Sequence, residues 1–260
     1  MAKLRLDKLL VERGLAQSRE RAQALVLAGR VLVNEQRVDK PGSNVPDDAA
    51  IRMLGDDLRY VGRGGLKLEG ALTAWGISVE GLACADIGAS TGGFTDCLLQ
   101  HGAASVLAVD TGYGQMAHKL RVDPRVTLLE RTNARLLTPG QLAPLSPQSV
   151  KFFAMDVSFI SATLVLPAVL GALVAAESAW QGEAVILVKP QFEAGREHVG
   201  KGGIVRSAEA QQGALDRVQD SVRTTGGSVQ AVMDSPILGM EGNREFLLWA
   251  KWSETVVSRQ

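Results

Sequence analysis

Cysteine and histidine are scarce in this chain of 260 residues, which holds two cysteines and three histidines. Cys84 and Cys97 are not spaced as in a Cys-x-x-Cys metal or redox motif, and the histidines stand singly. We therefore expect two reduced thiols in the core of a cytosolic protein, with neither a disulfide framework nor a metal site.

The chain also lacks a long apolar run. The most apolar stretch, residues 164–176, is thirteen residues long and contains Pro167 and Gly171, whereas a membrane-spanning helix needs about 20 residues. The first residues have no apolar signal-peptide core. We expect a cytoplasmic protein without a membrane partner, in which residues 164–176 form a buried helix.

Net charge is absent as well, since 28 Lys and Arg residues balance 28 Asp and Glu residues. The charges are not evenly distributed along the chain. Residues 1–45 hold nine basic and five acidic residues, so the rest of the chain holds 19 basic and 23 acidic residues. A basic front end joined to an acidic body predicts that the front end meets a polyanion.

The front end has the pattern of a small α+β domain over residues 1–59. Leucines fall on one face of a helix over residues 5–13, and a serine is placed to cap a second helix over residues 19–28. Valines then flank a turn at residues 34–36, and a brief strand is expected at residues 51–54.

A glycine-rich stretch, residues 60–65, is typical of a linker, and the second domain is expected over residues 66–260. Apolar segments alternate there with helical patterns, which predicts a doubly wound, Rossmann-like α/β sheet of parallel strands. The last two strands are joined by residues 235–244, which show no helical period, so we expect a terminal antiparallel hairpin. The expected strands are Ala83–Ile87, Ser105–Val109, Val126–Leu129, Phe152–Met155, Ala184–Val188, Gly227–Asp234 and Glu245–Lys251.

The first of these strands runs into a loop of small residues that opens a helix. The loop contains Asp86, Gly88, Ser90, Gly92, Gly93 and Phe94. Small residues let the backbone approach a ligand, and a helix N-terminus offers unpaired N–H groups. Asp110 ends the second strand, where an acid can accept hydrogen bonds from both hydroxyls of a ribose. The spacing is not Gly-x-Gly-x-x-Gly, which favours an adenosyl ligand without a pyrophosphate; an NAD-dependent dehydrogenase and a mere tight turn stay open as alternatives.

A second glycine motif, residues 195–202, fits most of a phosphate-binding P-loop. It has Gly202 at the position where a Ser or Thr must hold Mg²⁺, and it lies well beyond the strand that ends at Val188. We interpret it as a mobile, substrate-facing loop.

Four charged residues are expected at the cleft. Asp156 and Lys189 end the fourth and fifth strands, and ligands of open α/β sheets bind beyond the carboxyl ends of the strands. Glu245 starts the last, antiparallel strand and so reaches the same edge, while Lys67 opens the first helix of the domain. Any one of them could be a surface charge, but two acids and a lysine at corresponding ends of three strands predict a common site.

Such a cluster can hold one lysine as a general base. An ordinary lysine has a pKa of about 10.4, so a neutral amine near pH 7 requires a shift of roughly three units. Burial and a second lysine would lower the pKa, whereas two acids would raise it. The acids are therefore expected to orient the lysine, whose neutral amine takes the proton from a ribose 2′-hydroxyl as that oxygen attacks a methyl carbon.

Several segments together resemble the hemolysin-A-like (TlyA) rRNA methyltransferases. These segments are Arg5–Asn34, Asp86–Phe94, Met155–Ser161, Val188–Glu193 and Gly242–Phe246. The resemblance covers nearly the whole chain. It implies a Rossmann-like class I methyltransferase sheet of the FtsJ-like type with a terminal antiparallel hairpin, preceded by a small α+β RNA-binding domain of the S-four ribosomal-protein type.

The resemblance also implies roles for individual residues. The family's catalytic tetrad falls on Lys67, Asp156, Lys189 and Glu245. Its S-adenosylmethionine motif falls on Asp86, Gly88, Ser90, Gly92, Gly93 and Phe94, with Asp110 at the ribose and Asn133 facing the adenine. The implied activity is 2′-O-methylation of ribosomal RNA at a cytidine. Gly62 departs from the serine expected in the linker, which leaves the chemistry unchanged but puts the coupling between the domains in doubt.

The implied partner is ribosomal RNA or a ribosomal subunit, and the oligomeric state stays open. We expect Arg5, Arg19, Arg21, Arg30 and Lys40 to contact phosphates or read RNA shape, although a solvated helical surface has the same composition. A non-catalytic ribosome-assembly factor is the alternative that would use the basic front end alone. It would leave the four cleft residues without a purpose.

Overall fold

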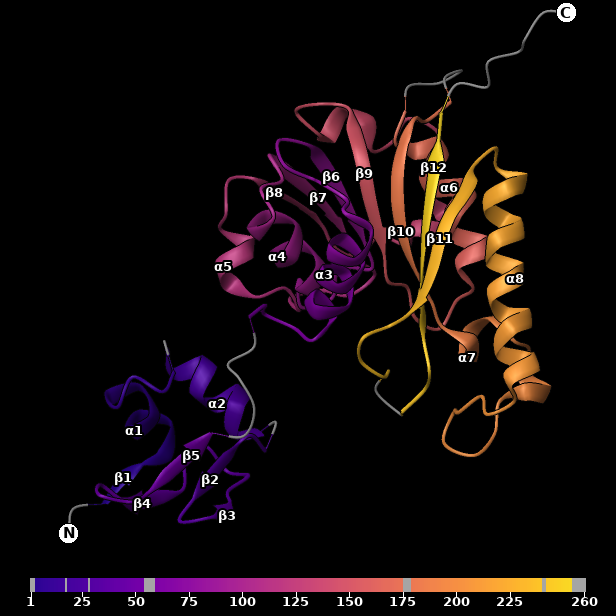
Figure 1. Cartoon of the computed structure of the whole chain (residues 1–260). Helices are drawn as coiled ribbons and strands as arrows, with labels where there is room; N and C mark the ends of the chain where they lie inside the picture. The colour runs from indigo at the N-terminus through magenta and orange to yellow at the C-terminus, as the bar shows by residue number, and fades with distance from the viewer. Residues whose placement is uncertain are drawn as a thin grey trace, which may run out of the picture. The chain divides into compact units, whose positions relative to one another are not determined.

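The computed structural model of the chain describes six stretches, namely residues 3–16, 18–27, 29–53, 59–174, 179–239 and 242–253. The chain divides into two compact units, Met1–Arg59 and Tyr60–Gln260 (Figure 1). The first unit consists of short helices and strands, and the second holds one large sheet between helices.

In its described residues, the first unit contains two helices and two small sheets. Its elements are β1 (Lys3–Arg5), α1 (Leu6–Glu12), α2 (Arg19–Leu27), β2 (Val31–Val33), β3 (Gln36–Arg37), β4 (Asn44–Pro46) and β5 (Ile51–Met53). β1 pairs with β4, and β2 lies between β3 and β5. Leu6, Leu10 and Val26 of the two helices share a core with β2. Both predicted helices and the hairpin are present; residues 28 and 54 of the predicted elements lie outside the described residues.

The turn of this hairpin is tighter than expected from the sequence. Asn34 and Glu35 have positive φ angles of 51° and 64°, and Gln36 already pairs with Val33. Two residues with positive φ form the type of turn whose twist matches that of a hairpin. The hairpin is therefore closed by residues 34–35 alone.

The second unit is a seven-stranded sheet with helices on both faces. Its strands are β6 (Ala83–Ile87), β7 (Ser105–Val109), β8 (Val126–Leu129), β9 (Val150–Met155), β10 (Gly182–Val188), β11 (Ser228–Asp234) and β12 (Phe246–Trp252). The strand order is β11-β12-β10-β9-β6-β7-β8. The five strands β6, β7, β8, β9 and β10 run parallel, whereas β12 is antiparallel to both β10 and β11. The predicted α/β fold with a terminal antiparallel hairpin is confirmed.

One helix of this unit precedes the first strand, and the others lie between successive strands along the chain. The helices are α3 (Gly64–Trp75), α4 (Gly93–Gln100), α5 (His118–Arg121), α6 (Ala162–Ala172), α7 (Pro190–Glu193) and α8 (Ala208–Thr224), with 3₁₀ turns η1 (Ala134–Leu136), η2 (Ala143–Leu145) and η3 (Arg196–His198). The apolar helix predicted over residues 164–176 is α6, which begins earlier, after the capping residue Ser161, contains Pro167 and ends at Ala172. Residues 175 and 176 of the prediction lie outside the described residues. No helix in the described part of the chain is long and apolar enough to cross a membrane.

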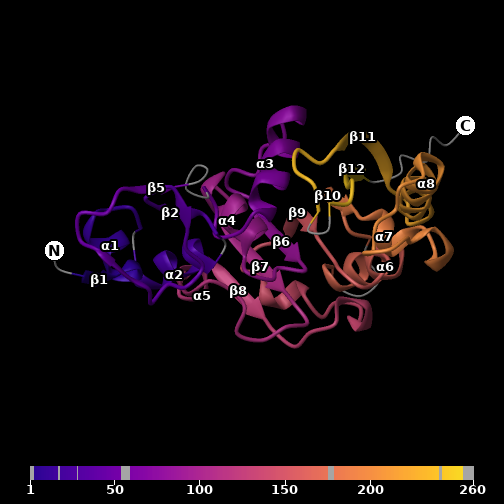
Figure 2. The ribbon, with the colours of Figure 1, turned by 90° about the horizontal axis from the view of Figure 1, so that it is seen from below.

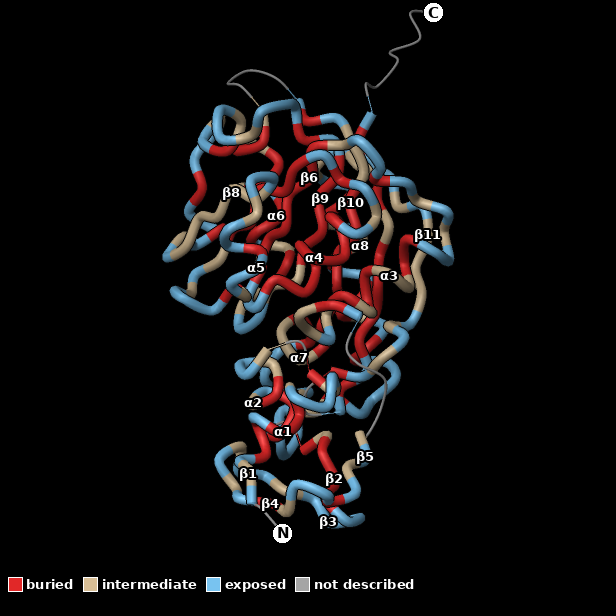
Figure 3. Tube along the Cα trace, turned by 90° about the vertical axis from the view of Figure 1, so that its left-hand side faces the viewer, coloured by how far each residue is buried: buried red, intermediate tan, exposed pale blue. Residues whose placement is uncertain are grey.

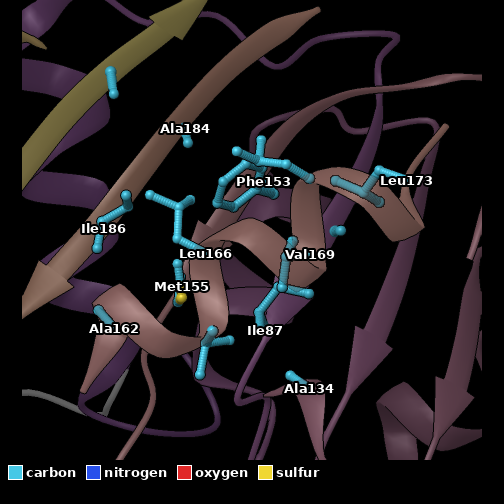
Figure 4. Packing of buried hydrophobic residues seen from close by; sticks show 14 of the residues in the cluster. Ile87, Ala134, Phe153, Met155, Ala162, Leu166, Val169, Leu173, Ala184 and Ile186 are labelled. Carbon is cyan, nitrogen blue, oxygen red and sulfur yellow. The ribbon is translucent and has the colours of Figure 1, made fainter. Parts of the chain in front are cut away.

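Two apolar cores cover the two faces of the sheet. α3 and α4 pack on one face, and α6 and α8 pack on the other (Figure 2). On the α6 face, Leu166 and Val169 lie among Ile87, Met155 and Ile186 (Figure 4). Buried residues consequently run along β6, β9 and β10 (Figure 3). Both faces being covered explains why these strands read as continuous apolar runs in the sequence.

Residues 60–65, which we predicted as a linker, belong to the second unit. Tyr60 is only 1% exposed, the Val61 N–H donates to Asp96 Oδ2 at 2.8 Å, and Gly64 begins α3. A Cβ on Gly65 would lie 2.3 Å from the Tyr60 ring. Glycine is thus required here for close packing, and the segment is an ordered start of the second unit.

Candidate active site

The ends of four elements meet at one edge of the large sheet. Asp156 follows β9 and Lys189 follows β10, while Glu245 precedes the antiparallel β12. Lys67 lies in the first turns of α3. All four predicted residues line a single cavity of about 610 Å³, so the structure brings together side chains that are far apart in the sequence.

The four residues form two ion pairs. Lys67 Nζ lies 2.5 Å from Glu245 Oε2, and Lys189 Nζ lies 2.5 Å from Asp156 Oδ1. The side chains of both lysines are only 10% exposed, that of Glu245 is 3% exposed and that of Asp156 is 22% exposed. Each ammonium is therefore held almost out of water by its own carboxylate.

Residues that sequence reasoning did not assign complete the surroundings of Lys189. Besides its ion pair with Asp156, its ammonium donates a hydrogen bond to Ser158 Oγ at 2.7 Å. Phe159 is 92% exposed with a positive φ of 63°, and its ring centroid lies 5.3 Å from that of Phe192. Both rings line the cavity. An exposed ring that packs against a half-buried one at a cavity offers a surface on which a nucleobase can stack. The Met-Asp-Val-Ser-Phe motif carried this signal, but a sequence motif does not state which side chains are left uncovered.

The glycine loop after β6 forms another wall of the cavity. Gly88, Ser90, Gly93 and Phe94 line it. Gly88 has a φ of 90°, and a Cβ there would lie 2.2 Å from the carbonyl oxygen of Asp156. Glycine is therefore required at this position by the loop after β9, in addition to any closeness to a ligand.

Asp86 lies beneath this loop and is fully buried. Its Oδ2 accepts hydrogen bonds from Thr95 N at 2.8 Å and from Thr95 Oγ1 at 2.6 Å, while its Oδ1 has no hydrogen-bond partner among the described residues. Burial, reinforced by the nearby charges of Asp156 and Asp110 and opposed by the Thr95 hydrogen bonds, raises the pKa of Asp86 to about 7. Asp86 supports the loop from below and does not line the cavity.

Three further predicted cofactor residues, like Asp86, lie outside the cavity lining. Asp110 accepts from Ser90 N at 2.8 Å and from Gly112 N at 2.6 Å, so its carboxylate ties the glycine loop to the segment after β7. Gly92 caps α4 with a φ of 94°. Asn133 is exposed, and its side chain accepts from Arg135 N at the start of η1. A contact of these residues with a cofactor remains a prediction.

The P-loop-like stretch, residues 195–202, is part of the cavity wall. Val199 of this stretch lines the cavity, as does Gly203 directly after it, and the next α-helix begins only at Ala208. Asn243, 2% exposed, accepts from Val205 N at 3.1 Å and donates to Gly203 O at 2.9 Å. The stretch thus reaches the cavity at Val199, and the residues directly after it are hydrogen-bonded to Asn243, two residues before Glu245. It does not run directly into an α-helix as a phosphate-binding loop would.

In the first unit, two of the predicted RNA-binding arginines are held by an acid that sequence reasoning did not single out. Asp7 is fully buried and accepts from Arg5 Nε and Nη2 at 3.0 and 2.9 Å, from Arg19 Nε at 3.0 Å and from Gln23 Nε2 at 3.0 Å. The Arg5 hydrogen bonds, with those of Gln23 and Arg19, hold the pKa of Asp7 well below its usual range. Arg21 and Arg30 are half-buried, and Lys40 is exposed.

The cavity has the features that S-adenosylmethionine requires. One part is formed by the glycine loop and the Phe94 ring, and another is charged. Gln191, at the wall, has a buried Oε1 without a hydrogen-bond partner among the described residues, which leaves an acceptor for a ligand ammonium or hydroxyl. Within the described part of the chain, no group of three or more His, Cys, Asp or Glu side chains could hold a metal ion.

An open sheet of this order, with a glycine loop after its first strand and a charged cavity at its carboxyl edge, defines the Rossmann-like methyltransferase class. Residues 60–252 match the FtsJ-like methyltransferase family, and residues 4–51 match the S4 domain. The chain belongs to the FtsJ-like methyltransferase family, with an S4 domain at its front. The family predicted from the sequence is confirmed.

Named relatives match the chain over nearly its full length. YqxC of Bacillus subtilis is 49% identical over 250 residues, which cover 96% of this chain and 86% of the relative. The 16S/23S rRNA (cytidine-2′-O)-methyltransferase TlyA of Mycobacterium tuberculosis is 44% identical over 248 residues, covering 95% of this chain and 89% of the relative. A solved structure from Streptococcus thermophilus that carries a hemolysin name is 44% identical, with a TM-score of 0.73 and coverage of 98% of this chain and 90% of that chain.

Proposed function

We propose that the protein transfers the methyl group of S-adenosylmethionine to a ribose 2′-hydroxyl of ribosomal RNA, at a cytidine. The observation that carries the proposal is the convergence of Lys67, Asp156, Lys189 and Glu245 on one cavity of an FtsJ-like domain. The nucleotide and the class of RNA follow from the activity for which the Mycobacterium tuberculosis relative is named.

The cofactor is assigned to the part of the cavity formed by the glycine loop. Gly88, Ser90, Gly93 and Phe94 would contact it, with Asp86 and Gly92 shaping the loop, Asp110 reaching the ribose and Asn133 the adenine. S-adenosylmethionine, when bound, supplies a methyl group on a positively charged sulfur, which is reactive enough that alignment accounts for much of the acceleration.

Lys189 is assigned the proton transfer. In its neutral form, Nζ accepts the proton that the ribose O2′ loses as this oxygen takes the methyl group. Asp156 and Ser158, at 2.5 and 2.7 Å, fix the direction of Nζ. Lys67 and Glu245 form the second ion pair of the cavity. Glu245 would hold the Lys67 ammonium in a fixed direction beside the ribose.

The S4 domain is assigned the contact with structured RNA. Arg5, Arg19, Arg21, Arg30 and Lys40 would bind phosphates, which sets affinity and register without reading the sequence. The Phe159 ring would receive a base turned out of its helix, because bases of RNA are commonly read after they are unstacked and placed on aromatic side chains. The substrate is accordingly ribosomal RNA, either free or within a ribosomal subunit.

The test is to incubate the protein and a labelled methyl donor with the small subunit, the large subunit and naked rRNA in turn, and then to map the labelled position. We expect label on the ribose of a cytidine. Label on a base, or no label on any RNA, would overturn the proposal. Titration with S-adenosylmethionine and NAD separates this function from a dehydrogenase, because only the first is expected to bind.

A further inference from the structure

The loops after β9 and β10 carry most of the groups around Lys189. Residues 156–161 follow β9, and residues 189–193 follow β10. Because β9 and β10 are parallel neighbours, the two loops leave the sheet side by side. Lys189 contacts Asp156 and Ser158 across them, and the rings of Phe159 and Phe192 lie 5.3 Å apart. The distance between these loops therefore sets the geometry at the ammonium.

A buried carboxylate joins the same two loops at their far ends. Glu193, at the end of α7, is 7% exposed and does not line the cavity. Its Oε2 accepts from Ser161 Oγ at 2.5 Å, and its Oε1 accepts from Ala162 N at 2.7 Å. Ser161 caps α6, and Ala162 is the first residue of that helix. One carboxylate is therefore bonded to both the cap and the first turn of the helix that follows the β9 loop.

Glu193 is itself held in place on the opposite side. The Arg217 guanidinium on α8 donates to the backbone carbonyl oxygen of Glu193. Burying a carboxylate is unfavourable unless hydrogen bonds compensate for the lost water, and burial does raise the pKa of Glu193 despite the Ser161 and Ala162 bonds. A group that is costly to bury, and that the proposed chemistry does not use, calls for a positional explanation.

We propose that Glu193 is a positioning residue that clamps the β10 loop to the start of α6 and thereby aligns Lys189 with Asp156 and Ser158. The inference rests on the proposed function for its effect on turnover, and on the structure alone for its effect on Lys189. A displacement of about 1 Å at a reacting group can cost a factor of about 100 in rate. Loosening this clamp consequently acts on the chemistry, while the cavity wall formed by the glycine loop stays intact.

Three substitutions separate this role from mere stabilisation. Glu193→Ala removes both hydrogen bonds, and Ser161→Ala removes one of them. Glu193→Gln keeps both, since its Oε1 can accept from Ala162 N and its Nε2 can donate to Ser161 Oγ. The matched control is Ser207→Ala, because Ser207 caps α8 through Ala210 N as Ser161 caps α6, but does not line the cavity.

The experiment uses the full chain, well below the melting temperature of each variant. We expect Glu193→Ala to lower kcat by about 10- to 100-fold and to shift the pH–rate profile, with cofactor affinity unchanged. Ser161→Ala should fall between Glu193→Ala and wild type, and Glu193→Gln should recover most of the rate. Ser207→Ala should keep the wild-type rate and profile.

A second readout does not depend on activity. The NMR signal of the Lys189 Cε methylene, which reports the surroundings of Nζ, should move in Glu193→Ala and Ser161→Ala, and it should stay at the wild-type position in Glu193→Gln and Ser207→Ala. A folded Glu193→Ala protein with an unchanged Lys189 signal overturns the inference, as does a Glu193→Gln protein that behaves like Glu193→Ala. If the wild-type protein methylates no RNA, the proposed function fails, and the Lys189 signal still decides the role of Glu193.

Discussion

The Asp7 cluster of the first unit and the cavity of the second unit use the same pairing of a cation with a carboxylate in opposite ways. In the Asp7 cluster the acid is hidden and the cations are exposed: the Asp7 side chain is 0% exposed, and those of Arg5 and Arg19 are 43% and 47% exposed. In the cavity of the second unit both partners are largely hidden, with Lys67 and Lys189 each 10% exposed. The chemical pairing is similar, but its access to water differs.

This difference separates a binding surface from a reaction site. Asp7 anchors its arginines by some of their N–H groups, and a guanidinium has five, so others stay available to phosphate oxygens. An ammonium inside a cavity, by contrast, can contact only the few ligand atoms that enter the cavity. Its electrostatic interactions there are stronger than in water. We therefore expect single substitutions in the cavity to have large effects on rate or stability. Single substitutions on the first unit should each have a small effect on RNA affinity.

The largest effect is expected from Lys189→Ala. Loss of the group that takes the ribose proton should lower methyl transfer by about 10²- to 10⁴-fold, because this is the usual contribution of general acid–base catalysis. Cofactor affinity should be unchanged, since the glycine loop forms its own part of the cavity. The measurement is single-turnover transfer of a labelled methyl group, together with calorimetric titration of the cofactor.

Lys251→Ala is the matched control for this experiment. Lys251 also pairs with a carboxylate, Glu183 at 3.0 Å, but near the opposite end of β12 and β10. Its loss should leave turnover unchanged. Retained turnover in Lys189→Ala would contradict the mechanism.

The next effect is on stability, from Glu245→Ala. This change leaves the Lys67 ammonium buried without its carboxylate, and breaking a buried pair in this way costs about 3–5 kcal/mol of unfolding free energy. Glu35→Ala breaks the ion pair with Arg52, in which the Arg52 side chain is 56% exposed and the Glu35 side chain 68% exposed. We expect no measurable change in unfolding free energy from this substitution. Urea unfolding of both variants checks the contrast. Equal losses in the two would remove the distinction between buried and exposed pairs.

A third prediction concerns pH and Asp86. Its pKa in the folded chain is raised to about 7, whereas an unfolded chain has an ordinary value of about 3.9. Between these values the folded state holds a proton that the unfolded state has lost, so this group lowers the unfolding free energy as pH rises from about 4 to about 7, by at most about 4 kcal/mol. Asp86→Asn should therefore become more stable relative to wild type across that window. A difference between the two proteins that does not change with pH would contradict the raised pKa.

The sequence predicted the fold almost to the residue in the second unit. β6, β7 and β8 have the predicted limits, and β9 and β10 extend the prediction by two residues at their starts. Long apolar segments between helical patterns carry strong signals, because both faces of a parallel sheet are buried. β1 and β4, with three residues each, were missed since their pairing depends on contacts far along the chain. Residues 60–65 were misread because glycine serves close packing as well as flexibility.

The location of the site could be predicted from the ends of the strands, but the contacts between its side chains could not. The topology alone places Asp156, Lys189 and Glu245 at one edge, so their convergence followed from the order of the segments. Which lysine pairs with which acid, and that Ser158 joins the second pair, depends on side-chain geometry. Glu193 and Asn243 were within recognised motifs, but a motif gives no sign of burial or of hydrogen-bond partners. Asp110, Gly92 and Asn133 show the converse, since a residue type in the right position need not face the cavity.

The smallest effect is expected from Lys40→Gln in the first unit. If the exposed ammonium neutralises one RNA phosphate, its removal should reduce the slope of log affinity against log salt by about 0.7 to 0.9, with turnover of saturating RNA unchanged. Lys8→Gln is the matched control, because Lys8 is exposed in the same unit and is not among the predicted contacts. A slope that falls equally in both variants would indicate attraction to the overall charge of the unit and would contradict a defined phosphate contact. A slope that falls only in Lys40→Gln would place this lysine on the RNA, as expected if the exposed cations of the first unit form the RNA-binding surface.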